Sequence, residues 1–221
     1  MDQSRPGPDL VIFDCDGVLV DSELLSCQCL SDELSGFGIS LTLVQALELF
    51  LGRSTSAITQ HYRELGQTVP VDFPFRLKSR VLSAFEKALH PIPDIDTVLS
   101  GLRVPNCVAS SSDLDRVALS LRVAGLAPHF GDRIYTAQMV THGKPAPDLF
   151  LHAAEKMGAQ PARTLVIEDS VSGVLAAKAA GMTVWGFVGG SHYRGRDGQD
   201  MLSGAGADRV FAHMSDFWKD A

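Results

Sequence analysis

The chain has 221 residues, of which 45% are hydrophobic and 20% are charged, a composition typical of a globular protein of one or two domains. The formal net charge of -7 argues against a basic surface for nucleic acid or anionic membrane, so neither partner is expected. No apolar run is long enough to span a bilayer. The polar, proline-rich start at Met1–Pro8 predicts neither a signal peptide nor a membrane anchor.

The first predicted element is a short buried strand, Leu10–Phe13, which ends at the carboxylates Asp14 and Asp16. Polar residues in that position lie where open α/β sheets hold their ligands. Two like charges this close need a bound cation, a shared proton or full solvation. A solvated Asp-x-Asp-Gly turn explains the same residues, so the pair alone leaves both interpretations open.

Helical patterns without strand-like alternation follow between Asp21 and His90. Asp21 or Ser22 is expected to cap the first helix, which ends near Gly36. Three further helices are predicted at Leu43–Leu51, Ser54–Leu65 and Phe73–Leu89. The sequence therefore predicts an all-helical domain over residues 21–89, of about seventy residues, inserted after the first strand.

Strand and helix patterns alternate in the rest of the chain. The predicted strands are Asn106–Ala109, Arg133–Thr136, Thr164–Ile167, Thr183–Val188 and Arg209–Phe211. The predicted helices run from Ser112 or Asp113 to Gly125, over Pro147–Met157 and over Ser170–Ala180. This alternation predicts an α/β core, a Rossmann-like doubly wound parallel sheet formed by residues 1–20 and 90–221.

The four cysteines are interpreted as structural residues. Cys15 and Cys107 lie on predicted buried strands, where cysteine acts as a small hydrophobic residue. Cys27 and Cys29 have neither a second pair nor a nearby histidine, so no zinc site is expected. Free cysteines suit a reducing cytoplasm, which is the expected compartment.

Polar residues also follow three later predicted strands. Ser110 and Ser111 precede a helix start and can form a phosphate cradle, Lys144 lies in a proline-containing loop, and Glu168 and Asp169 begin another helix. Each has an ordinary explanation, as a cap, a surface lysine or an acidic first turn. We expect all of these residues to lie at one edge of the sheet, together with Asp14 and Asp16. Such a group indicates a site where oxygen atoms hold Mg²⁺ beside a bound anion. Such a set predicts phosphoryl transfer.

These motifs resemble the four motifs of the haloacid dehalogenase-like hydrolases. They are Asp-x-Asp-Gly-x-Leu-x-Asp-Ser, the serine after the second strand, Gly-Lys-Pro-x-Pro-Asp and Glu-Asp-Ser-x-x-Gly. The helical insert resembles the cap of that family. Phe-Asp-Cys-Asp-Gly and Val-Ile-Glu-Asp-Ser-Val-Ser-Gly are most similar to the branch of sugar-phosphate phosphatases and β-phosphoglucomutases, with the bacterial 6-phosphogluconate phosphatases especially similar.

The resemblance implies a role for each motif residue. Asp14 is implied as the nucleophile that accepts the phosphoryl group. Asp16 is implied as the general acid for the leaving alcohol and then the general base for water. Ser110, Ser111 and Lys144 are implied to bind phosphate oxygens. A carboxylate is a good leaving group, so hydrolysis in two steps is chemically sensible.

The resemblance also implies Mg²⁺ as the cofactor. Asp14 and Asp16, the latter through its main-chain carbonyl, are implied ligands, together with Asp169, which Glu168 assists. In the cap, Arg53 is the candidate for reaching the substrate, and a solvated arginine explains it equally well.

The remaining assignments are less specific. Glu23 either binds a sugar hydroxyl or only stabilises the N-terminus of its own helix through its negative charge. The seven histidines are given no role, and the glycine-rich segment Gly189–Gly195 is expected to be flexible, lining the entrance or forming an ordinary loop.

The expected function is Mg²⁺-dependent hydrolysis of a small phosphorylated metabolite, a sugar or sugar-acid phosphate, by a monomer or weak homodimer. Asp16 argues against a haloacid dehalogenase, and Lys78, the first lysine, comes too late for a phosphonatase. β-Phosphoglucomutases carry a histidine where this chain has Ser26, which favours hydrolysis over the alternative of a phosphosugar mutase. A phospho-accepting receiver or a catalytically silent binding protein is the distant alternative; receivers are much shorter and lack a helical insert.

Overall fold

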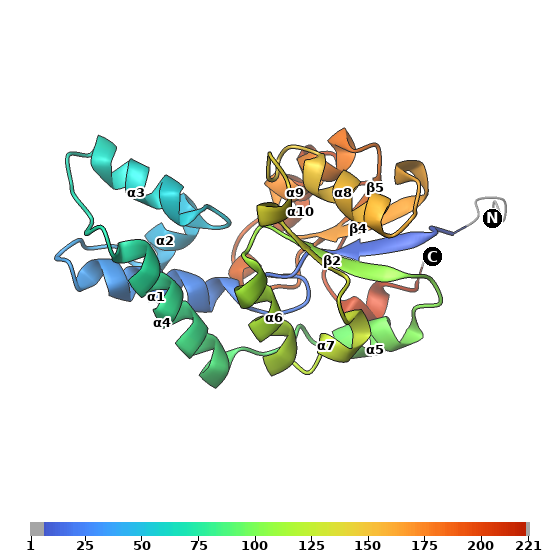
Figure 1. The fold of residues 1–221 in the computed structure, drawn as a ribbon, viewed down its shortest axis with the longest axis horizontal. Helices are drawn as coiled ribbons and strands as arrows, with labels where there is room; N and C mark the ends of the chain where they lie inside the picture. The colour runs from blue at the N-terminus through green and yellow to red at the C-terminus, as the bar shows by residue number, and fades with distance from the viewer. Residues whose placement is uncertain (1–6, 220–221) are drawn as a thin grey trace. The chain divides into compact units, whose positions relative to one another are not determined.

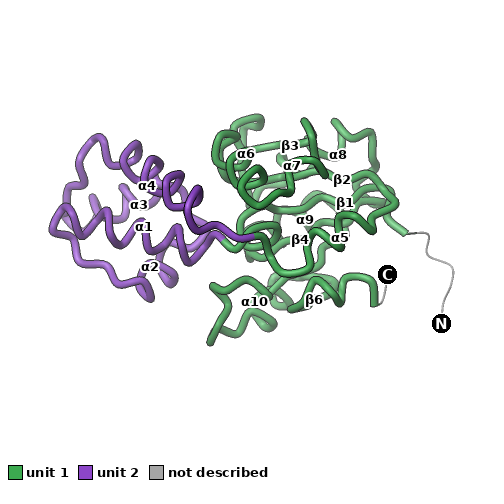
Figure 2. Tube along the Cα trace, turned by 90° about the horizontal axis from the view of Figure 1, so that it is seen from below, with its two compact units in different colours: residues 1–21, 91–221 green, residues 22–90 purple. Residues whose placement is uncertain are grey.

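The computed structural model describes residues 7–219, which belong to two compact units (Figure 2). Unit 1 contains residues 1–21 and 91–221, and unit 2 contains residues 22–90. Each border lies one residue beyond the border expected from the sequence. Residues 1–6, part of the polar start for which we predicted no signal peptide or anchor, lie outside the described range.

Unit 1 is built on a six-stranded parallel sheet with the strand order β3-β2-β1-β4-β5-β6 (Figure 1). Its strands are β1 (Leu10–Phe13), β2 (Asn106–Ser110), β3 (Ile134–Thr136), β4 (Thr164–Glu168), β5 (Thr183–Phe187) and β6 (Arg209–Phe211). β1 lies at the centre, so the winding reverses there and ligand-binding residues are expected at its carboxyl end. The predicted doubly wound α/β fold is confirmed.

Helices of unit 1 cover both faces of this sheet. They are α5 (Ile95–Gly101), α6 (Leu114–Val123), α7 (Ala127–Phe130), α8 (Asp148–Lys156), α9 (Val171–Ala179) and α10 (Gly198–Gly204). Ile12 packs in the core that α8, α9 and α10 share with the sheet. Phe13, on the opposite face by strand alternation, packs on Phe130 of α7 and on Phe217. Burial on both faces explains why β1 is an uninterrupted apolar run.

Unit 2 consists of helices α1 (Glu23–Ser35), α2 (Leu43–Phe50), α3 (Thr55–Glu64) and α4 (Phe73–Ala88) within the described chain. Thr42 begins α2 with a capping box to Gln45, and Ser54 caps α3. α1 packs against α2 and α4. Glu33 of α1 is buried, and its carboxylate pairs with two arginines of α4, Arg76 at 2.6 Å and Arg80 at 2.7 Å.

Two expected helix starts differ from the structure. Ser22 stands at the N-cap of α1 but makes no side-chain capping bond. Asp21 does not cap α1 either, because its Oδ1 accepts hydrogen bonds from the main-chain nitrogen and the hydroxyl of Ser191. Pro147 is the N-cap of α8 rather than its first residue. Asp21 thus bonds to Ser191, which is distant in the sequence, instead of capping the adjacent helix.

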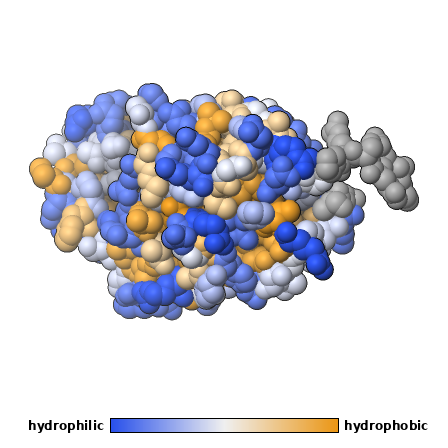
Figure 3. Space-filling view, turned by 45° about the vertical axis from the view of Figure 1, so that its right-hand side comes forward, coloured by the Kyte–Doolittle hydropathy of each residue, from blue (hydrophilic) through white to orange (hydrophobic). Residues whose placement is uncertain are grey.

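All four cysteines are buried and free, as their interpretation as structural residues requires. Over the described residues, none of the helices is long and apolar enough to cross a membrane. On the face drawn in Figure 3, apolar residues lie in small groups among polar ones.

Candidate active site

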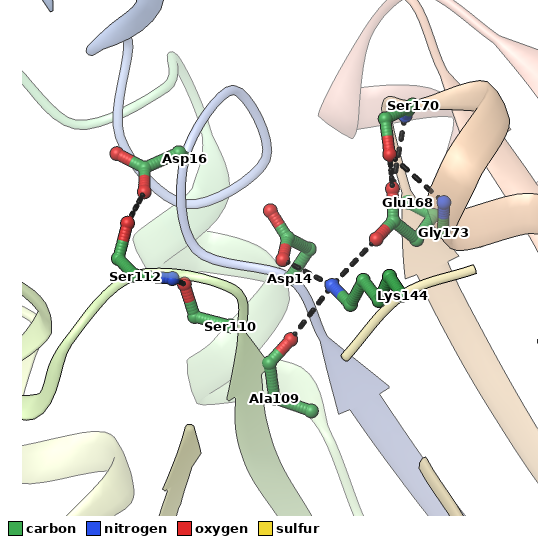
Figure 4. Close-up of polar contacts among 9 residues, drawn as sticks. All are labelled: Asp14, Asp16, Ala109, Ser110, Ser112, Lys144, Glu168, Ser170 and Gly173. Atoms are coloured by element: carbon green, nitrogen blue, oxygen red, sulfur yellow. Dashed lines mark hydrogen bonds and ion pairs between the residues drawn. The ribbon is translucent and has the colours of Figure 1, made fainter. Parts of the chain in front are cut away.

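Lys144 links two of the predicted acidic positions (Figure 4). Its Nζ lies 2.5 Å from Oδ1 of Asp14 and 2.6 Å from Oε1 of Glu168, and it donates to the main-chain oxygen of Ala109 at 3.0 Å. Burial would lower the pKa of Lys144, but the carboxylates of Asp14 and Glu168 together hold this pKa above its usual value. The lysine is therefore a fixed positive charge beside Asp14.

Asp14 follows β1 directly and is buried. Burial raises the pKa of its carboxyl group well above the usual value; Lys144 opposes this rise, while Glu168 and Asp169 add to it. The ionised form of Asp14 is thus destabilised, because the site has too little positive charge to balance it. A carboxylate in this state is suited to bind a cation or to react as a nucleophile.

Asp16 is held by two side chains that follow β2. Ser112 donates its hydroxyl to Oδ2 at 2.6 Å, and Arg116 donates to Oδ1 at 2.7 Å. Asp113, and not Ser112, caps α6 by accepting from the main-chain nitrogen of Arg116 at 3.0 Å. This leaves the Ser112 hydroxyl for Asp16. The sequence did not predict Arg116, because no local pattern joins it to a residue in the first motif.

The two predicted phosphate-binding serines differ in exposure. Ser110 ends β2 with its side chain buried, and its Oγ accepts a hydrogen bond from the main-chain nitrogen of Ser112 at 3.1 Å. Ser111 is exposed. Both precede α6, where main-chain N–H groups favour an anion. Ser110 belongs to the same group of side chains as Asp16 and Lys144 (Figure 4).

Glu168 ends β4 and uses both carboxylate oxygens within the protein. Oε1 contacts Lys144, and Oε2 accepts from the main-chain nitrogen and hydroxyl of Ser170, each at 2.9 Å. A Cβ at Gly173 would lie 1.8 Å from the Glu168 carboxylate, so this residue requires glycine close by. The geometry supports Glu168 as the partner that holds Lys144 in place, and gives less support to its predicted role toward a metal.

Asp169 is contacted by a segment for which the sequence predicted something different. Gly189–Gly195 was expected to be flexible, yet Ser191–Tyr193 forms a 3-10 turn with His192 and Tyr193 buried. His192 Nε2 lies 3.2 Å from Oδ2 of Asp169. The expectation that no histidine pairs with a motif is therefore wrong for His192, because a contact between positions distant in the chain leaves no local signal.

The donor set fits a hard cation. Burial raises the pKa of Asp169 well above its usual value, and Glu168 and Asp16 add to the rise while Lys144 opposes it. Asp14 and Asp169 thus both carry charge that a cation would relieve, with oxygen donors that Mg²⁺ prefers. Among residues 7–219, no group of three or more His, Cys, Asp or Glu side chains is arranged around one metal position. The resemblance implies the main-chain oxygen of Asp16 as a further protein ligand.

Glu23 and Arg53 belong to unit 2. Glu23 is the first residue of α1, and Arg53 is exposed after Gly52, whose φ of 67° is a conformation that favours glycine. Their predicted contacts with a substrate remain predictions.

Comparison with known proteins decides the family. A model described as haloacid dehalogenase-like hydrolase matches residues 8–181. This chain belongs to that family.

Relatives within the haloacid dehalogenase-like family include named phosphatases. The 6-phosphogluconate phosphatase of Escherichia coli is 28% identical, over 83% of this chain and 84% of that protein. The fructose-1-phosphate phosphatase YqaB of Escherichia coli is 34% identical, over 78% of this chain and 92% of that protein. The resemblance found in the sequence motifs and the assignment to the hydrolases are confirmed.

A solved structure of the same family shares the fold. The hydrolase from Deinococcus radiodurans, described with bound phosphate and sodium, is 37% identical. The match covers 96% of this chain and 94% of that one, with a TM-score of 0.77.

Proposed function

We propose that this chain is a Mg²⁺-dependent phosphatase that hydrolyses a small phosphorylated metabolite, a sugar or sugar-acid phosphate, through an aspartyl-phosphate on Asp14. The observation that carries the proposal is the contact of 2.5 Å between Lys144 and a buried Asp14. The lysine supplies positive charge where phosphate oxygens would lie, and Asp16 stands two residues further on as the proton carrier.

In the first step an oxygen of Asp14 attacks the phosphorus atom, the bond from phosphorus to the leaving oxygen breaks, and Asp16 donates a proton to that oxygen. In the second step Asp16 takes a proton from water, which attacks the aspartyl-phosphate and restores the Asp14 carboxylate with release of phosphate. Ser112 and Arg116 each contact one Asp16 oxygen, so one of these contacts must open for each transfer. Mg²⁺ held by Asp14, Asp169 and the main-chain oxygen of Asp16 would neutralise phosphate charge.

Unit 2 is proposed to be the cap that selects the leaving group, with Arg53 and Glu23 as substrate contacts. We favour hydrolysis over phosphosugar mutase activity, because this chain has Ser26 at the position where mutases carry a histidine. The Ser26 hydroxyl donates to the main-chain oxygen of Ser22 at 2.9 Å, within its own helix. The names of the curated relatives, which refer to phosphates of a sugar acid and of a sugar, support the proposed substrate class.

The test is a screen of phosphorylated sugar acids, hexoses, pentoses and glycolate for phosphate release with Mg²⁺ and with EDTA. We expect Mg²⁺-dependent turnover on one substrate class. Isomerisation of a glucose phosphate without phosphate release would establish the mutase instead. No turnover on any substrate would support a binding or phospho-accepting protein.

A single variant in unit 2 tests the cap assignment. Arg53→Ala should raise KM for the metabolite by about tenfold, which corresponds to the loss of one charge-assisted hydrogen bond, and change KM for a small aryl phosphate little. Steady-state kinetics on both substrates measure this difference. Equal effects on both would assign Arg53 a role in folding.

A further inference from the structure

The segment after β5 places two consecutive side chains on Asp169. His192 Nε2 lies 3.2 Å from Oδ2 of the carboxylate, and the Tyr193 hydroxyl donates a hydrogen bond to the main-chain oxygen of the same residue. Both side chains are buried, and their rings pack with centroids 4.3 Å apart. One short turn therefore contacts Asp169 at its side chain, through an approach of 3.2 Å, and hydrogen-bonds its main chain.

Two glycines make room for this arrangement. Gly17 has a φ of 79°, and a Cβ there would lie 1.8 Å from Oδ2 of Asp169 and 3.0 Å from Cε1 of His192. A Cβ at Gly190 would lie 2.7 Å from Cε1 and 2.8 Å from Nδ1 of His192. The imidazole and the carboxylate thus fill a space that closely approaching main chain bounds on two sides.

The turn Ser191–Tyr193 is also hydrogen-bonded to the residue that precedes unit 2, Asp21. Asp21 accepts hydrogen bonds from Ser191 at 3.0 Å from the main-chain nitrogen and at 2.7 Å from the hydroxyl. Three neighbouring residues, Ser191, His192 and Tyr193, each contact an aspartate of unit 1 or its main chain. Space filling alone would not require polar groups at each of these positions.

We propose that His192 and Tyr193 are positioning residues that fix the orientation of the Asp169 carboxylate toward its cation. The inference rests on the proposed function, in which Asp169 binds Mg²⁺. Carboxylates that bind a metal are oriented by the groups around them, and loss of such an outer partner weakens metal affinity by about tenfold to a hundredfold.

The test compares four variants with the wild-type full-length protein. His192→Leu removes the nitrogen, His192→Gln retains an N–H donor, and Tyr193→Phe removes only the hydroxyl. Arg194→Ala is the matched control, because Arg194 follows Tyr193 directly and its side chain is exposed. Isothermal titration calorimetry measures the Mg²⁺ Kd without substrate, and thermal unfolding in EDTA measures folding.

We expect His192→Leu to raise the Mg²⁺ Kd by about tenfold to a hundredfold. Tyr193→Phe should raise this Kd less, His192→Gln should stay closer to wild type than to His192→Leu, and Arg194→Ala should match wild type. At saturating Mg²⁺, KM for an aryl phosphate should change little in all four variants.

An unchanged Mg²⁺ Kd in folded His192→Leu and Tyr193→Phe, with only a lower Tm, would overturn the inference and assign both residues a structural role. If His192→Leu does not fold, Tyr193→Phe decides by the same measurement. Absence of Mg²⁺ binding by the wild-type protein would instead overturn the metal-dependent function itself, and the inference with it.

Discussion

In unit 2 the buried carboxylate of Glu33 lies between Arg76 and Arg80, whereas in unit 1 the carboxylates of Asp14 and Glu168 share the ammonium group of Lys144. The arginines of unit 2 reach water, with 45% and 44% of their side chains exposed, while Lys144 is 4% exposed. In unit 2 the two arginines therefore balance the buried charge of Glu33. In unit 1 one lysine faces two carboxylates, which leaves an excess of negative charge at the end of the sheet. That excess disfavours the ionised carboxylates and favours binding of cations.

The largest effect is expected from removing the proposed nucleophile in unit 1. Asp14→Asn should lower kcat for phosphate release by at least about a thousandfold, because the amide cannot accept the phosphoryl group. Steady-state assays with Mg²⁺ measure this loss, and circular dichroism verifies the fold. Retained turnover in a folded Asp14→Asn protein would reject Asp14 as the nucleophile.

The next largest effect is on stability. Lys144→Met removes the cation from two buried carboxylates, so the free energy of unfolding should fall by about 3–5 kcal/mol. Lys178→Met is the matched control, since Lys178 pairs with Asp208 at an exposed site and its loss should cost about 0–1 kcal/mol. Urea denaturation measures both variants. Equal losses would show that the burial of Lys144 carries no special cost.

A smaller effect is expected in unit 2. Glu33→Gln should lower the free energy of unfolding by about 1–2 kcal/mol, because Arg76 and Arg80 lose a charged acceptor but remain accessible to water. Urea denaturation measures the loss, and kcat at saturating substrate should stay at the wild-type value. A loss as large as that of Lys144→Met would mean that the two units do not differ in how they balance charge.

The smallest expected effect is a gain in the free energy of unfolding that depends on pH. Burial, with added repulsion from Glu168, raises the folded-state pKa of Asp169, so the ionised carboxylate destabilises the metal-free fold. This penalty is absent below the pKa of the unfolded chain and grows as pH rises through the folded-state pKa.

The metal-free protein allows this gain to be measured. Asp169→Asn should be more stable than wild type in EDTA at about pH 8 and lose that advantage at about pH 4. Urea denaturation at both pH values compares the two proteins. An advantage that does not change with pH would refute the electrostatic explanation.

The strands were predictable because apolar runs flanked by turn residues are typical of a doubly covered parallel sheet. β1 and β6 have the predicted bounds, and β2 and β4 extend by one residue to include Ser110 and Glu168. The helices α5, α7 and α10 were not predicted. They are short, so few turns of apolar periodicity distinguish them from loops.

The site was predictable where its residues follow strands, and unpredictable where they pack across the fold. Asp14, Lys144 and Glu168 all follow predicted strands, and parallel strands bring such positions to one edge. Arg116 and His192 have no such marker. Glycine and serine around His192 indicated flexibility, but Gly17 and Asp169 bury its side chain from positions far away in the sequence.

The position of β1 has a consequence for synthesis of the chain. β1 leaves the ribosome before the other described strands, and its neighbours in the sheet, β2 and β4, begin only at Asn106 and Thr164. Unit 2 is made of one continuous segment, residues 22–90, with contacts of shorter range. The helices of unit 2 can therefore fold on a nascent chain while the apolar residues of β1 still lack partners, and this interval exposes β1 to aggregation and to chaperones.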